Sequence, residues 1–246
     1  MRRVIGTVLL VGFPWLCVAA SAQTLPTQAD TTAPATPQEF VQLTFIHGVP
    51  YDRARALGPG AVPVLTKMLQ ESMQRPDSAE GPTLANIAVT LGILGDPASV
   101  DLLIDFVQRG SGQLSREAYA ARTSAVMALG YLVNVSSDAR ALKYLQDSAD
   151  PQAWDRRSVA WGSPFGQSPA DRNQQLAEVA VLGLALTGKP EAAATLRQLA
   201  ARKDAGPSGD RVAQVASDAL KEHEIVARDG LSAYYKRRLE IPGRRR

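Results

Sequence analysis

The sequence predicts an all-α chain in which antiparallel helix pairs repeat as an α-solenoid. The clearest unit surrounds Leu-Gly-Ile-Leu-Gly-Asp-Pro at 91–97, which indicates a helix end, a tight turn and the start of a second helix capped by Asp96. Weaker copies follow at 129–132 and 184–192. No alternating run of β-branched residues is long enough to predict a sheet. Repeated helix–turn–helix units stack on one another, and such proteins usually bind rather than catalyse.

Apolar spacing and proline positions locate the individual helices. Val100, Leu103, Ile104 and Val107 lie at i, i+3, i+4 and i+7, which is one face of a helix, and residues 212–219 repeat the pattern. Several expected first turns carry a proline, where a missing N–H costs little. We expect about five helix pairs, at 37–46 with 59–72, 82–94 with 97–109, 115–133 with 137–148, 169–187 with 190–203, and 210–224 with 227–239.

One unit is longer than the others. Equivalent leucines are 38 residues apart from Leu91 to Leu129 and 36 apart from Leu184 to Leu220, near the ~40-residue period of two-helix repeats. The step from Leu129 to Leu184 is 55 residues. The solenoid at 37–239 therefore carries an insertion, which we place at 150–168.

The repeat residues resemble those of a known family. They are Ala-Val-Thr-Leu-Gly-Ile-Leu-Gly-Asp-Pro at 88–97 with Leu102 and Leu103, and 125–130 and 184–199 follow with less fidelity. On these residues the chain resembles the HEAT-repeat family, in the short bacterial form called HEAT-like or phycobilisome-lyase-like repeats. The resemblance implies an α-solenoid and a family of scaffolds, adaptors and a few enzymes.

Small residues recur where neighbouring helices should cross. Gly92 and Gly130, with Ala88, Ala125 and Ala180, lie within the best-formed units. Side chains this small allow two helices to approach closely. We expect leucine and valine to fill the space between the layers.

Residues 1–22 have the pattern of a secretory signal. Arg2 and Arg3 supply the positive start, 4–20 is an uncharged and mostly apolar run, and Ala-Ser-Ala offers a cleavage site after Ala22. The alternative is an uncleaved N-terminal membrane anchor, although 17 residues lie at the lower edge of a bilayer span. Cleavage predicts a periplasmic or secreted protein.

The segment at 23–36 is polar, contains prolines and lacks periodicity, so it predicts a disordered linker. Cys17 is the only cysteine of the chain and would leave with the signal. The mature chain would then have no disulfide and no thiolate ligand.

Positive charge is concentrated at the two ends of the chain. The whole chain has 27 basic and 24 acidic residues, but 236–246 alone holds six basic residues against Glu240. The body is therefore acidic, which does not indicate nucleic-acid binding. The basic C-terminal tail, 240–246, leaves open a contact with anionic membrane surfaces.

No catalytic motif is found, and the chain is predicted not to be an enzyme. His47 and His223 are the only histidines, and no metalloprotease, phosphate-loop, nucleophile-elbow or dinucleotide motif occurs. Glu222 and Glu224 flank His223, but adjacent helical residues point about 100° apart and cannot converge on one ion. We predict no cofactor and no metal. A hydrolytic or lyase-type enzyme that uses carboxylates on the concave face stays open as an alternative.

The insertion is the first candidate for partner binding. Its candidate contact residues are large aromatic and basic side chains, the usual anchors of interfaces: Trp154, Arg156, Arg157, Trp161 and Phe165. The alternative is that the rings pack the insertion onto the solenoid, because large rings left in water favour aggregation.

The second helices of the units supply the other candidate surface, since they line the concave face in HEAT-type solenoids. The charged and polar side chains expected there are Asp101, Asp105, Gln108, Arg140, Lys143 and Arg197. They predict a groove of mixed charge for a protein partner of unknown identity, or else a solvated polar face. The chain is thus predicted to be an exported interaction module or scaffold, with a regulatory partner of an envelope enzyme or transporter as the alternative.

Overall fold

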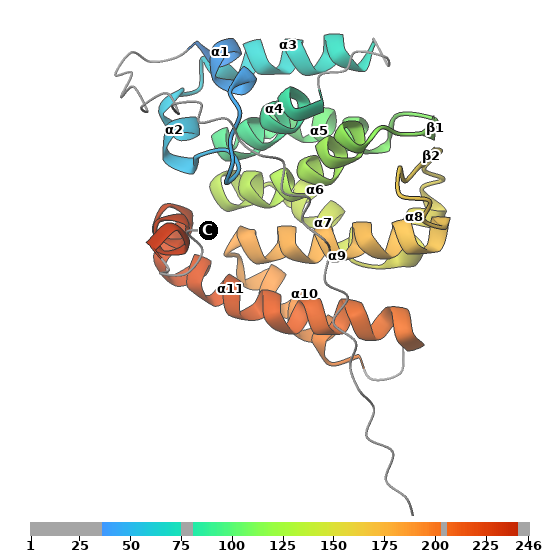
Figure 1. Ribbon diagram of the computed structural model, residues 1–246. Coiled ribbons are helices and arrows are strands. Elements are labelled where there is room, and N and C mark those ends of the chain that lie inside the picture. The colour runs from blue at the N-terminus through green and yellow to red at the C-terminus, as the bar shows by residue number, and fades with distance from the viewer. Residues whose placement is uncertain (1–35, 75–80, 203–205, 241–246) are drawn as a thin grey trace, which may run out of the picture. The chain divides into compact units, whose positions relative to one another are not determined.

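The computed structural model describes residues 36–74, 81–202 and 206–240 (Figure 1), and this part of the chain is mostly helical, as predicted. The predicted signal at 1–22, nearly all of the linker at 23–36 and all of the tail at 240–246 except Glu240 lie outside the described residues. The α-helices are α1 (Pro37–Gln42), α2 (Tyr51–Ala56), α3 (Ala61–Met73), α4 (Gly81–Leu94), α5 (Val100–Gln108), α6 (Arg116–Ser136), α7 (Ala139–Ser148), α8 (Pro151–Arg156), α9 (Pro169–Thr187), α10 (Pro190–Ala200) and α11 (Gly206–Glu240).

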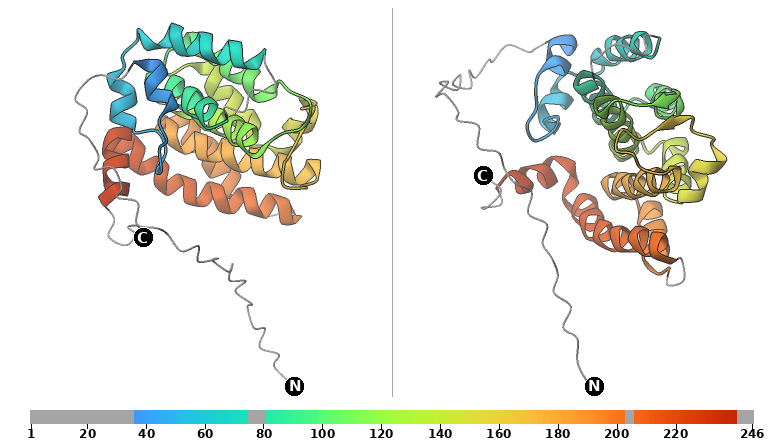
Figure 2. Two further views of the ribbon diagram at one scale, coloured as in Figure 1. Left: turned by 45° about the horizontal axis from the view of Figure 1, so that its top comes forward. Right: turned by 45° about the vertical axis from the view of Figure 1, so that its right-hand side comes forward.

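Four helices lie side by side in chain order: α4, α6, α9 and α11 (Figures 1 and 2). We call these the first helices. The second helices α5, α7 and α10 pack behind them, with α7 against both α6 and α9 and α10 against both α9 and α11. The helices of the second, third and fourth predicted pairs are therefore present, within a few residues of their expected bounds.

The turn between α4 and α5 forms as the sequence predicts. Gly95 adopts φ 76°, a conformation that favours glycine. The Asp96 side chain then accepts a hydrogen bond of 2.8 Å from the Ala98 N–H and caps a short 3₁₀ turn, Pro97–Ser99, that leads into α5.

Glycine brings the first helices into backbone contact, which confirms the prediction made from Gly92 and Gly130. A Cβ placed on Gly92 would lie 2.3 Å from the Ala128 carbonyl oxygen, and one placed on Gly130 would lie 2.2 Å from that of Gly183. No side chain fits at either crossing. The α4–α6 and α6–α9 contacts therefore require glycine.

The two ends of the array differ from prediction. The first unit holds two short helices, α1 and α2, before α3, instead of one helix at 37–46. The last unit was expected to break between 224 and 227, but α11 continues through this stretch because none of its residues disfavours a helix. The break falls at Gly230, where φ is 78° and ψ is 165°.

The insertion contains the one feature that an all-helical prediction omits. Besides α8, it includes the short strand β2 (Trp161–Gly162), which pairs in parallel with β1 (Gly112–Gln113) of the α5–α6 connection. Two residues per strand are too few to leave an alternating sequence pattern. The pairing nevertheless ties the insertion to the body of the protein.

Candidate functional site

Trp161 joins the insertion to the helices beneath it. Its ring is fully buried, and its Nε1 donates a hydrogen bond of 2.9 Å to the Val107 carbonyl at the end of α5. The guanidinium carbons of Arg122 and Arg172 lie 5.9 and 5.4 Å from the ring centroid, and Tyr119 meets the ring edge-on at 5.7 Å. Each contact comes from a helix outside the insertion, so Trp161 is a packing residue.

Trp154 is also fully buried, and it holds α8 against α7. Its Nε1 donates 2.8 Å to the Ser148 carbonyl, and its ring meets Tyr144 edge-on at 6.4 Å. The Arg157 guanidinium lies over Tyr144 and Trp154, at 4.3 and 4.9 Å, and donates 2.7 Å to Ser148 Oγ. The hypothesis that Trp154 and Trp161 contact a partner directly is therefore corrected, because both rings are fully buried and their Nε1 groups donate to backbone carbonyls. Arg157 is half-buried and packs on the insertion, and its contact with a partner stays a prediction.

Two of the five candidates in the insertion do face solvent. Phe165 is 54% exposed, with one edge on Tyr119 at 5.9 Å and Arg116 over its ring at 5.5 Å. Arg156 is exposed and forms an ion pair of 3.1 Å with Asp150. Of the five candidates, Phe165 and Arg156 are therefore the two best placed to contact a partner.

The buried residue that sequence reasoning missed here is Arg172. It lies within α9 and is only 7% exposed, and its guanidinium donates to the carbonyls of Val159 and Trp161 and to Asn173 Oδ1. Burial lowers the pKa of Arg172 from its ordinary value. Nothing in its local sequence distinguishes it from a solvated arginine of a helix, because the carbonyls it binds lie in the insertion.

The charged face of the second helices is largely paired with itself. Arg140 bridges two units, with an ion pair of 2.9 Å to Asp101 and another of 3.1 Å to Asp138. Lys143 pairs with Asp147 at 2.9 Å, and Asp105 with Arg109 at 2.9 Å. Exposed pairs of this kind contribute little to stability, because water and salt screen them. This arrangement fits the solvated polar face better than a groove that awaits a charged partner.

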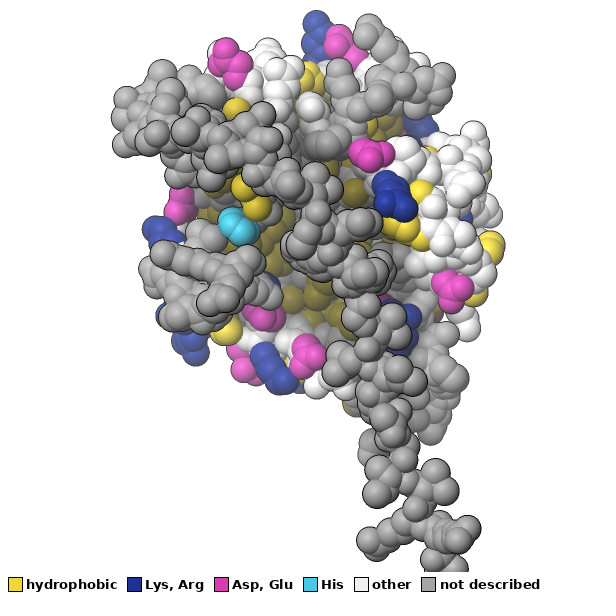
Figure 3. Space-filling view, in the orientation of Figure 1, with side chains coloured by type: hydrophobic (Ala, Val, Ile, Leu, Met, Phe, Trp, Pro, Cys, Tyr) yellow, Lys and Arg dark blue, Asp and Glu magenta, His cyan; other side chains and the backbone are white. Residues whose placement is uncertain are grey.

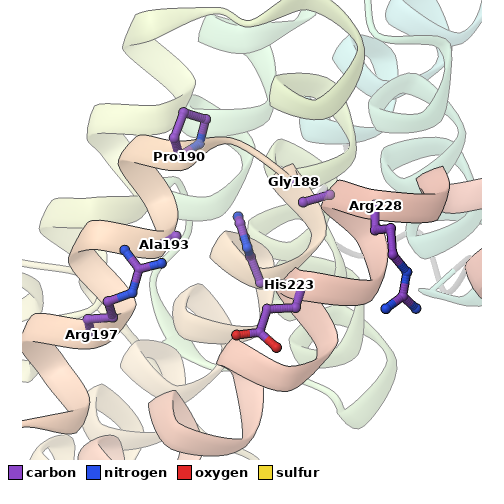
Figure 4. A pocket seen from close by; sticks show the side chains of 8 residues that line it. Gly188, Pro190, Ala193, Arg197, His223 and Arg228 are labelled. Atoms are coloured by element: carbon purple, nitrogen blue, oxygen red, sulfur yellow. The ribbon is translucent and has the colours of Figure 1, made fainter.

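Arg197, the last predicted contact residue, lines a shallow pocket of about 440 Å³ between α10 and α11 (Figure 4). Arg197 and Arg228 lie on opposite sides of His223, with Gly188 and Pro190 beside them. His223 is buried, and its Nε2 donates 2.9 Å to the Lys189 carbonyl at the α9–α10 turn. The hydrogen bond and the burial give His223 a structural role in joining these helices.

His223 makes the stability of this helix contact depend on pH. Burial lowers its pKa below the ordinary 6.5, so the folded chain favours the neutral imidazole. The contribution of neutral His223 to the free energy of unfolding is fully present above pH 6.5. It is lost as pH falls through the lowered pKa of the folded chain, because the unfolded chain binds a proton at His223 at a higher pH than the folded chain does. We expect the urea midpoint to fall from pH 7.5 to pH 5, and to fall less in His223→Gln. An equal fall in both proteins contradicts this assignment.

An apolar face on the first helices was not predicted. Val89 of α4, Met127 of α6 and Val179 of α9 are partly buried, and Leu182 of α9 is 42% exposed. We call these four residues the apolar face. Figure 3 shows a hollow over α6 and α9 with hydrophobic side chains on its floor.

Hydrogen bonds and helical spacing place these four residues on one side of the layer. Asn86, three residues before Val89, donates 2.9 Å to the Val41 carbonyl of α1, which packs on this side of α4. Met127 lies one turn before Tyr131, which meets Tyr235 of α11 on the same side of α6. Uncharged residues share this side of the three helices: Ala85, Ala120, Ser124 and Gln175.

This face could not be predicted from the sequence, because α4, α6 and α9 are apolar on several sides. Core and surface positions of such helices cannot be separated by periodicity alone. Within the described ranges, no group of three or more histidine, cysteine, aspartate or glutamate side chains is placed to hold a metal ion.

Comparison of the chain with family models, curated proteins and solved structures finds no match. Among the helices that the structure describes, none combines the length and the apolar character needed to cross a membrane. The surfaces of the described residues are therefore the features that bear on function.

Proposed function

We propose that the helices form a HEAT-like α-solenoid and that the chain is a protein–protein interaction module without catalytic activity. Three features support the solenoid: first helices in chain order, second helices packed behind them, and glycine crossings at equivalent places in successive units. A stack of this kind offers one long continuous surface, which is how solenoids bind extended partners.

The first helices line the inner side of the proposed curve. Backbone contact at Gly92 and Gly130 leaves no side chain between α4 and α6 or between α6 and α9 at these crossings. In a curved stack, the more closely spaced layer lies on the inside of the bend. On this proposal the first helices, and not the second helices with Asp101, Arg140 and Lys143, form the concave surface.

The observation that carries the proposal is the apolar face itself. Three helices place four apolar side chains on this side of the layer, and Leu182 is 42% exposed. The charged group beside them is Glu178, one turn before Leu182, and it is paired with Arg211 at 3.1 Å. Contiguous exposed apolar surface commonly marks an interaction site. We propose that this face binds an apolar segment of another protein. Export after cleavage at Ala22 is part of the proposal and is supported by the sequence alone.

The test is capture of a partner by the tagged full-length chain in wild-type and variant forms. We expect Leu182→Arg to reduce the recovered partner at least tenfold, because a charge would be buried in the contact. Ala194→Arg is the matched control, since Ala194 is exposed on α10 at the opposite side of the layer. The absence of a reproducible partner, or equal loss in both variants, overturns the proposal.

A further inference from the structure

The last turns of α11 leave the helical array and return to its first unit. After Gly230 the chain changes direction and runs as the segment 231–240, which we call the C-terminal strap (Figure 2). Tyr235 of the strap stacks on Tyr51 of α2, with ring centroids 6.1 Å apart and planes inclined by 21°. Lys236 forms an ion pair of 3.4 Å with Asp52 of the same helix. These contacts join the two ends of the array.

The strap also touches the side of α6 that carries the apolar face. The hydroxyl of Tyr235 is hydrogen-bonded to that of Tyr131, one helical turn beyond Met127. Burial is the main cause that raises the pKa of both phenols, so both stay protonated and either hydroxyl can donate the one hydrogen bond between them. Leu231 and Tyr234 of the strap are 2% and 3% exposed. The strap thus occupies one end of the surface assigned to a partner.

The chain turns at Gly230 in a conformation that side chains disfavour. Its φ of 78° and ψ of 165° fall in a region that is essentially restricted to glycine. A Cβ placed there would meet no atom within 4 Å. An alanine at this position therefore strains the turn without removing or obstructing any contact.

We propose that the C-terminal strap is an intramolecular competitor that occupies the Tyr131 end of the apolar face and swings away at Gly230 when a partner segment binds. The strap carries two tyrosines and three consecutive basic residues, Lys236 to Arg238. A partner segment of aromatic and basic character would repeat its contacts with Tyr51, Tyr131 and Asp52. The role of the strap as a competitor rests on the proposed function, but its displacement can be measured alone.

The probe is a fluorescein-labelled peptide of residues 231–246, added to the full chain and followed by fluorescence anisotropy. In the wild-type chain the attached strap competes at the high effective concentration of a linked segment. We expect Gly230→Ala to bind the peptide at least tenfold more tightly than wild type, because the strained turn releases the attached strap. The double variant Gly230→Ala with Tyr51→Ala should lose this gain, since it lacks the receiving ring.

Trypsin cleavage at 236–238 gives a second readout. We expect Gly230→Ala and Tyr235→Ala to be cut there at least tenfold faster than wild type while the rest of the chain keeps its helical circular dichroism signal. If wild type and Gly230→Ala bind the peptide equally and are cleaved equally, the proposal that the strap is a displaceable competitor is overturned. If Gly230→Ala fails to fold, Tyr235→Ala decides by the same two readouts.

The two proposals fail in different ways. If Gly230→Ala binds the labelled peptide more tightly than wild type but no partner is captured, the strap is supported and the proposed function is overturned. If wild type and Gly230→Ala capture a partner equally and bind the labelled peptide equally, the proposed function is supported and the role of the strap is overturned.

Discussion

Gly130→Ala is expected to destabilise the chain strongly, as is Gly92→Ala at the neighbouring helix crossing. The added carbon would lie 2.2 Å from the Gly183 carbonyl oxygen and 2.9 Å from its carbonyl carbon. Both neighbours are backbone atoms of α9, so α6 and α9 must separate for the methyl group to fit. Overpacking of this kind costs ~1–3 kcal/mol where side chains can move, and we expect about 3 kcal/mol or more here.

The measurement is the urea midpoint of the helical circular dichroism signal. Gly60→Ala is the matched control, because Gly60 has a φ of −63° and a Cβ there meets nothing within 4 Å. We expect that control to be neutral or stabilising by up to ~1 kcal/mol. Equal midpoints in the two variants would show that the α6–α9 crossing is not in backbone contact.

Trp161→Ala is the second substitution with a large expected effect. It removes a fully buried ring that lies between two guanidinium groups and leaves the Val107 carbonyl without its donor. Large aromatic residues replaced by alanine in a core cost ~3–5 kcal/mol. We expect a loss in that range, together with faster proteolysis of the insertion.

Two controls separate packing from exposure at the insertion. Trp161→Phe keeps an aromatic ring between Arg122 and Arg172 but loses the Nε1 hydrogen bond, so it should cost about 1–2 kcal/mol. Phe165→Ala should change the unfolding free energy by less than ~0.5 kcal/mol, because Phe165 is 54% exposed. A loss at Phe165 as large as that at Trp161 contradicts the packing role assigned to Trp161.

The local sequence was sufficient to predict most helices, one helix cap and the close helix crossings, because each depends on residues near one another in the chain. Apolar spacing identified most of the helices, and Asp96 caps the second unit as expected because a cap depends on residues two or three positions away. Gly92 and Gly130 identified the helix crossings, since only a missing side chain permits backbone contact. The step of 55 residues predicts an insertion, and α8 and β2 lie between α7 and α9 in that stretch.

Other features depend on residues far apart in the chain. Whether Trp154 and Trp161 pack or face a partner was open in the sequence, and it is decided by Ser148, Val107, Arg122 and Arg172. The charged residues of the second helices predicted either a groove or a solvated polar face. Arg140 reaches Asp101 across 39 positions and forms an ion pair, which favours the solvated face.

Most of the central helices, the Asp96 cap and the crossings at Gly92 and Gly130 followed from the sequence, because these depend on spacing and residue size along one segment. Only the tertiary structure decided which apolar positions of α4, α6 and α9 are covered and which, like Leu182, stay exposed. It also decided that the end of α11 returns to Tyr51 in α2. Burial and long-range contacts depend on which helices become neighbours. In helices that are apolar on several sides, the local sequence does not indicate which side will be covered.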